Sequence, residues 1–260
     1  MKNKMKSIVT LTYRNMFISI DKVTYGWQLI WPIAWIYLVG YSITGLMGDE
    51  KISINGVDVP YYAFVAVGMI VFNAMNTSEV SGSIIWKDKR NGMLLQLLTM
   101  RYNIFHYIVS NLITIVLMGL ASALVIGIIG YPAFGNYAHF EIISFVCFIY
   151  ALITASIFFG SMSIVLSCLT RNSEQFAMFS NGLHYFFTFA AATFYPLYSV
   201  PEPLRTIFLF NPMTHFMNLT REGIFGVVEQ PQVFIELSVI TVSTIVIFAL
   251  AFHLMKKIKI

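Results

Sequence analysis

The chain has 260 residues, of which 58% are hydrophobic and 11% charged, and its mean hydropathy is +0.75. A soluble domain carries about 25% charged residues and cannot bury this much apolar surface. The composition also excludes a disordered chain, a collagen and a disulfide-stapled secreted domain. The net charge of +4 does not indicate nucleic acid, because the basic residues stand at the ends of apolar segments. The sequence therefore predicts an integral membrane protein.

The first apolar pattern is amphipathic and covers residues 3–23. Apolar residues recur there at helical spacing and alternate with lysines and other polar residues. Such a helix lies in the cytoplasmic interface, with its lysines toward anionic headgroups. We assign residues 1–24 to this interfacial helix and residues 25–260 to a transmembrane domain. The alternative for the first segment is a frayed soluble tail.

Six longer apolar stretches follow, each able to cross about 30 Å of hydrocarbon. An even number of crossings puts both termini on one side. That side carries 13 of the 16 basic residues, so the positive-inside rule makes it cytoplasmic. The sequence predicts a multi-pass protein of the plasma membrane with both termini in the cytoplasm. The crossings are expected at residues 27–46, 61–85, 107–131, 142–169, 176–195 and 233–254.

Two inward loops separate these stretches, at residues 84–101 and 170–175. The first has a charged cluster followed by a short apolar helix pattern. An apolar face is unfavourable in water, so we expect it to dock against this protein or a cytoplasmic partner. Such loops suit a part that receives force from a cytoplasmic machine. The apolar pattern consists of Met93, Leu94, Leu97 and Leu98.

The outward segment 196–230 is too short to cross the membrane twice and too apolar for a plain loop. Pro203 suits the first turn of a helix that runs through residue 210, and Asn211-Pro212 turns the chain. A second helix over residues 213–225 is expected to stop at Gly226. The sequence therefore predicts an all-α membrane protein with six transmembrane helices, an N-terminal interfacial helix and a re-entrant extracytoplasmic helix pair before the last span.

Several polar and aromatic residues inside the spans are candidates for a translocation path. Glu79 is the one acid well inside an apolar stretch, and its place about 27 Å along the helix also permits contact with water or Arg90. The polar stripe beside it faces a neighbouring helix or a path rather than lipid. The tryptophans of the first span either pack or line such a path. The candidates are Trp31, Trp35, Asn73, Asn76, Glu79, Phe186 and Phe187.

Motifs for chemistry are absent from the sequence. There is no phosphate-binding glycine loop, no metal-ligand spacing among the five isolated histidines and no nucleophile motif. We therefore expect no catalytic residue, no metal and no cofactor on this chain.

The outward segment resembles the C-terminal signature of ABC-2 type transporter membrane subunits, and most closely that of drug-resistance and nodulation-type exporters. The 87–98 segment is similar to the coupling region of the same family, with Gly92 in place. Leu95 and Met100 stand where the family often has Glu and Pro, so a Glu-mediated contact is not expected. The residues that carry the outward resemblance are Tyr195-Pro196, Pro201, Leu204-Arg205, Asn211-Pro212-Met213-Thr214, Arg221 and Gly226.

The resemblance implies the permease subunit of an ATP-binding-cassette exporter. Two such permeases, expected to be a homodimer, would pair with two cytoplasmic ATPase subunits that hold ATP and Mg. They would move an amphipathic or lipid-linked cargo, such as a drug or a glycan, out of the cytoplasm or the inner leaflet. The implied coupling residues are Trp86, Lys87, Asp88, Arg90, Gly92, Leu94, Leu97, Leu98, Arg171 and Glu174, and the implied outer-gate residues are Pro196, Pro201, Pro203, Arg205, Asn211, Pro212, Arg221 and Gly226.

Two other classes of protein stay open. A self-sufficient secondary transporter or channel should carry several ionisable residues inside the membrane, and Glu79 and the histidines are the candidates. A polytopic lipid-modifying enzyme would need acids or histidines clustered at one membrane face, and the sequence shows no such cluster.

Overall fold

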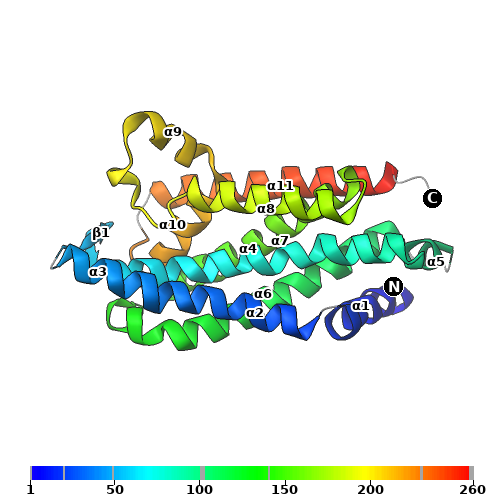
Figure 1. The fold of residues 1–260 in the computed structure, drawn as a ribbon, viewed down its shortest axis with the longest axis horizontal. Helices are drawn as coiled ribbons and strands as arrows, with labels where there is room; N and C mark the ends of the chain where they lie inside the picture. Colours follow the sequence, from blue (N-terminus) through cyan, green and yellow to red (C-terminus); the bar gives the residue numbers. More distant parts are fainter. Residues whose placement is uncertain are drawn as a thin grey trace.

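The computed structural model describes residues 2–19, 21–48, 50–99, 103–139, 141–228 and 231–257. Long helices run side by side along one axis (Figure 1). Helix α1 (Lys2–Arg14) and the end of α11 (Gln232–Lys257) lie at the same end of the bundle as α5 (Met93–Thr99). The first and last described helices therefore share one end, as an even number of crossings requires.

Five helical stretches among the described residues are long and apolar enough to cross a membrane. Their bounds contain or equal five of the expected stretches, because an uninterrupted apolar run leaves the backbone no partner but itself in lipid. They are residues Val23–Met47, α4 (Tyr61–Arg90), Ile104–Tyr137 with α6 (Ile104–Phe134) and η3 (Gly135–Tyr137), α7 (Ile142–Leu169) and α11.

The remaining expected crossing, residues 176–195, corresponds to helix α8 (Ser173–Phe189). Its 17 residues are just too few for a candidate span, because the chain turns from Ala190 onward. The structure thus gives five candidate spans, and the sixth crossing stays a prediction. Helix α8 packs against α4 and α7.

The N-terminal segments are helices with local π-helical turns. Helix α1 continues into η1 (Asn15–Ser19), and residue 20 lies outside the described residues. Asp21 caps a new helix that begins at Lys22, so the expected interfacial helix over residues 3–23 is not continuous. The first span is α2 (Lys22–Ala34), η2 (Trp35–Gly40) and α3 (Tyr41–Met47) in direct succession. Pro32 lies inside α2, and the π-helical turn begins three residues later. A proline removes one backbone hydrogen bond, which favours such a local change of pitch.

We call the end of the bundle with α1 and α5 the inner end and the opposite end the outer end, after the orientation that the sequence predicts. The outer end carries a small β-hairpin that the all-α prediction missed (Figure 1). Strands β1 (Ile52–Ile54) and β2 (Val57–Val59) pair antiparallel around Asn55-Gly56. Both turn residues have positive φ, at 43° and 87°, as a two-residue hairpin turn requires. The hairpin precedes α4 directly, and Val59 is fully buried.

The proline-rich outer segment folds as the sequence indicates. Helix α9 (Glu202–Phe210) carries Pro203 in its first turn, and α10 (Pro212–Phe225) begins at Pro212. Asn211 caps α10 by accepting a hydrogen bond from the Met213 amide at 3.0 Å. Gly226 ends the helix with φ +72°.

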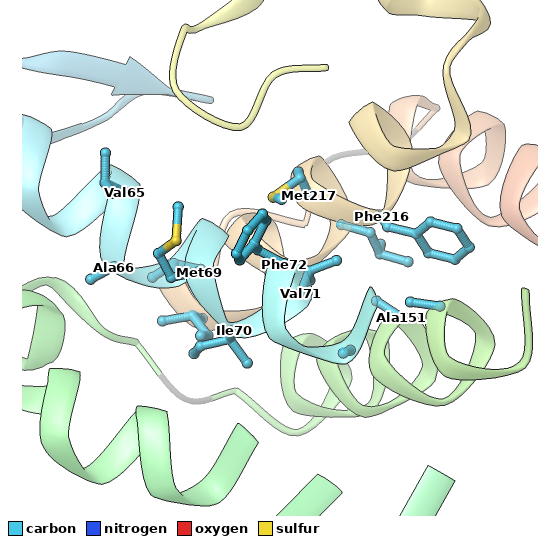
Figure 2. Packing of buried hydrophobic residues seen from close by; sticks show 14 of the residues in the cluster. Val65, Ala66, Met69, Ile70, Val71, Phe72, Ala151, Phe216 and Met217 are labelled. Atoms are coloured by element: carbon cyan, nitrogen blue, oxygen red, sulfur yellow. The ribbon is translucent and has the colours of Figure 1, made fainter. Parts of the chain in front are cut away.

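Helix α4 is the centre of the core. In its most apolar window 83% of the residues are buried inside the protein, against 17% for the first span and 22% for α11. Figure 2 shows side chains of α4, among them Met69 and Phe72, packed with Ala151 of α7 and with Phe216 and Met217 of α10. Protein rather than lipid therefore surrounds α4.

Helices α4 and α7 approach each other closely at Gly82. The Gly82 amide donates to Ser163 Oγ at 3.1 Å, and that hydroxyl donates to the Glu79 carbonyl at 2.9 Å. A Cβ atom on Gly82 would lie 2.5 Å from the Ser163 carbonyl oxygen, which is backbone and cannot turn aside. A side chain at this position would have to push the two helices apart.

We expect Gly82→Ala to lower the free energy of unfolding by about 1–3 kcal/mol, because the added methyl overpacks the contact between the helices. Thermal unfolding in mild detergent measures the change. Gly182→Ala is the matched control, since a Cβ atom there meets nothing within 4 Å. Equal stability of the two variants would contradict the close approach.

Candidate functional site

The apolar face of α5 docks on this protein. Gly92, with φ +69°, turns the chain from α4 into α5. Leu94 and Leu97 are then buried in a cluster with Leu11 of α1. Of the two docking partners that the sequence left open, these leucines therefore pack against this protein and not against a cytoplasmic partner. The Leu98 side chain lies outside the described residues. Leu95 remains 48% exposed on α5.

A buried ion pair fixes α1 to the inner end of α4. Arg14 Nη2 lies 2.7 Å from Asp88 Oδ2, with side chains 12% and 10% exposed. The Tyr107 hydroxyl donates to the same carboxylate oxygen at 2.6 Å. Arg14 also donates to the Asn15 amide oxygen, and Asn15 Nδ2 donates to Asn111 Oδ1 at 2.7 Å. Asp88, a coupling candidate, is therefore the anchor of α1.

The two inward loops are joined to each other. Trp86 Nε1 donates to Thr170 Oγ1 at 3.1 Å, and Lys89 Nζ donates to the Ser167 carbonyl at 3.3 Å. These contacts link the end of α4 to the end of α7 and the turn before α8. A movement of one loop must therefore reach the other. The coupling candidates that stay exposed around this junction are Lys87, Arg90, Arg171 and Glu174.

At the outer end, Arg221 holds the buried helix α10 in place. It is 2% exposed and donates to the backbone carbonyls of Ala192 at 2.6 Å and Thr193 at 2.9 Å. A third bond reaches the Phe64 carbonyl of α4 at 3.3 Å, and the guanidinium carbon lies 3.5 Å from the Phe64 ring centroid. A buried cation is tolerable only with such compensation.

The other outer-gate candidates fall into two groups. Asn211 donates to the Ala190 carbonyl at 2.7 Å, and Gly226 lies so close to His139 that a Cβ atom would come 2.7 Å from the His139 carbonyl oxygen. These two fix the ends of α10, which Pro212 begins. The second group is wholly or partly exposed on the segment that leads into and through α9, namely Pro196, Pro201, Pro203 and Arg205.

A histidine–glutamate pair that the sequence did not reveal joins α10 to α11. His215 Nδ1 contacts the Glu236 carboxylate, and His215 Nε2 lies 2.8 Å from the Leu209 carbonyl. Asn218 Nδ2 donates to the other oxygen of Glu236 at 3.0 Å. Burial alone lowers the pKa of His215, but the hydrogen bond and charge of Glu236, with the Leu209 carbonyl, raise it above its ordinary value. Separation by 21 residues hid this pair in the sequence.

Four of the seven path candidates meet at one cavity. A space of about 330 Å³ lies between the first span, α4 and α8, and Trp31, Trp35, Asn76 and Glu79 line it. The other three lie elsewhere: Asn73 and Phe187 are buried in the core, and Phe186 is 51% exposed.

The long apolar helices, the hydrogen-bonded inner end and the buried helix α10 define a polytopic helical membrane protein. A sequence model of the ABC-2 type transporter family matches residues 6–225. The chain therefore belongs to the ABC-2 type transporter family and is a membrane component of an ABC transporter. No curated protein matches it.

We expect Asp88→Asn to destabilise the inner end by about 3–5 kcal/mol, because Arg14 would be left as an unpaired buried charge. Limited proteolysis of α1 and thermal unfolding in detergent report the loss. Asp58→Asn, a change at an exposed residue of the outer hairpin, serves as the control. Unchanged protection of α1 in Asp88→Asn would refute the anchoring role.

The raised pKa of His215 makes stability depend on pH. The folded state holds the proton more tightly than the unfolded state, so the stabilisation is complete below about pH 6.5 and is lost as pH rises through the folded pKa. We expect the melting temperature to fall as the pH rises from about 6.5 through the folded pKa. His215→Gln should remove this dependence, and His253→Gln, at an exposed residue of α11, should retain it. A wild-type melting temperature that does not fall as pH rises above 6.5 would contradict the assignment.

Proposed function

We propose that the chain is the permease subunit of an ABC exporter. Two copies pair around a central path, and two cytoplasmic ATPase subunits bind their inward loops and hold ATP and Mg. The cargo is amphipathic or lipid-linked and leaves from the cytoplasm or the inner leaflet. Membership of the ABC-2 type transporter family supports this proposal.

The observation that carries the mechanism is the ion pair and the hydrogen bonds that join the helices at the inner end. Asp88 ties α1 to α4, and Trp86 ties α4 to the turn before α8. The apolar face of α5 is buried on the same structure. A push on the exposed surface of this end therefore acts on α1, α4 and α8 together, which is what an ATP-driven stroke requires.

The proposal includes a sixth crossing by α8. Its 17 residues span about 25 Å at 1.5 Å per residue. The following residues Ala191 to Phe194 are buried and continue outward to the carbonyls that Arg221 holds. With six crossings, the basic inner end faces the cytoplasm, and α9 and α10 form the re-entrant outer pair at the exit.

The proposal is tested by purifying the tagged chain from native membranes in mild detergent and identifying the proteins that accompany it. A stoichiometric ATP-binding-cassette subunit is the expected result. A clean single-chain oligomer without an ATPase would overturn the proposal and favour a self-sufficient transporter.

Leu95 offers a sharper test, because it is exposed on α5 while its neighbour Leu94 is buried. Leu95→Asp should weaken retention of the ATPase about tenfold or more, since it places a charge in an apolar contact. The melting temperature of the isolated permease should stay unchanged. Ser199→Asp adds the same charge at the exposed outer end and should leave retention intact. Normal retention in Leu95→Asp would place the ATPase contact elsewhere.

A further inference from the structure

The cavity between the first span, α4 and α8 has aromatic walls. Six of its eleven lining residues are aromatic. Trp35 and Phe194 lie 4.7 Å apart between ring centroids, and Phe189 lies 6.0 Å from Phe194. Trp31, 56% exposed, and Phe189, 53% exposed, form the mouth. A molecule that moves laterally between the first span and α8 therefore meets aromatic side chains first.

One carboxylate lies at this cavity. Among the eleven lining residues, Glu79 is the single Asp, Glu, Lys or Arg. Ser180 of α8 and Glu79 line the same small cavity. Neither ion pair found among the described residues includes Glu79. Within the part of the chain that the structure describes, Glu79 therefore has no cationic partner in an ion pair.

The space around Glu79 is not filled by protein. Glu79 and His184 also line a second cavity of about 30 Å³, which is room for about one water molecule. The His184 ring contacts Phe72 edge-on at 5.3 Å between centroids, which holds it at the wall. Glu79 therefore lines both a small cavity and a larger one with aromatic walls.

The chemistry of this arrangement selects among ligands. A neutral apolar molecule needs no carboxylate, and an anion is repelled by one. A divalent metal ion prefers six or more oxygen ligands with several carboxylates, whereas the lining offers one carboxylate, three neutral polar side chains and aromatic rings. Among the described residues no three His, Cys, Asp or Glu side chains are grouped as metal ligands. An organic cation gains from both features, because ring faces attract positive charge and a desolvated carboxylate pairs with it.

We propose that this cavity binds organic cations with apolar or aromatic substituents, and that these are a cargo class of the transporter. Glu79 supplies the charge, and Trp31 and Trp35 supply the faces. That these cations are cargo rests on the proposed transport function. Their binding to the cavity needs only this chain.

The test uses the full-length permease in nanodiscs and two probes of matched shape, tetraphenylphosphonium and tetraphenylborate. Each ion is compared between wild type and Glu79→Gln, because the two ions partition differently into lipid. Glu79→Gln should weaken tetraphenylphosphonium binding about tenfold or more and should not weaken tetraphenylborate binding. Glu202→Gln, the same change at an exposed residue of α9, is the control and should change neither.

Two further variants guard against a folding defect in Glu79→Gln. Glu79→Asp keeps the charge and should keep most of the cation affinity. Trp31→Leu, at the exposed mouth, should weaken tetraphenylphosphonium binding about threefold or more. Unchanged cation binding in Glu79→Gln, or an equal loss for both ions, would overturn the inference. Because the assay contains no ATPase, a negative result leaves the co-purification test of the proposed function unaffected.

Discussion

Lipid offers no hydrogen-bond partner, so a membrane helix carries polar side chains only where other helices surround it. In this protein α4 meets that condition, because α6, α7 and α10 pack around it. Its burial permits Asn73, Thr77 and Ser78 at the core and Glu79 at a cavity. The peripheral helices keep apolar outer faces, as the exposed residues of α6 and α11 show. The division between a polar centre and an apolar periphery depends on this one arrangement.

Charged groups hold α4 at both of its ends. At the inner end Asp88 binds Arg14, and at the outer end the Phe64 carbonyl accepts from Arg221. The cavity with Glu79 lies along the same helix, between these two contacts. A rigid helix held at both ends can couple events at one end to the other without a chain of small side-chain movements. A displacement of the inner loops can therefore reach the cavity and the outer helix pair through α4.

The sequence predicted what depends on local pattern and missed what depends on pairing across distance. Apolar length located the five candidate spans, and Pro203, Asn211 and Gly226 located the outer helices, because proline and glycine act through their own backbone. The hairpin was missed although Asn55-Gly56 is a strong turn signal, since its strands have three residues each. The Arg14–Asp88 and His215–Glu236 pairs join residues 74 and 21 positions apart, and no periodicity records such contacts. The cavity likewise needed the placement of three helices before Trp31 and Glu79 could be seen to share it.

The hydrogen bonds of Arg221 bear on the order in which the chain matures during synthesis. The three carbonyls that Arg221 holds belong to Phe64, Ala192 and Thr193, all of which leave the ribosome earlier. Until residue 221 follows, those carbonyls lack the guanidinium that satisfies them in the finished fold. The outer half of the protein is therefore completed late in translation, by a residue beyond four-fifths of the chain length. A nascent chain arrested before α10 would expose this unfinished outer half to the quality-control proteases of the membrane.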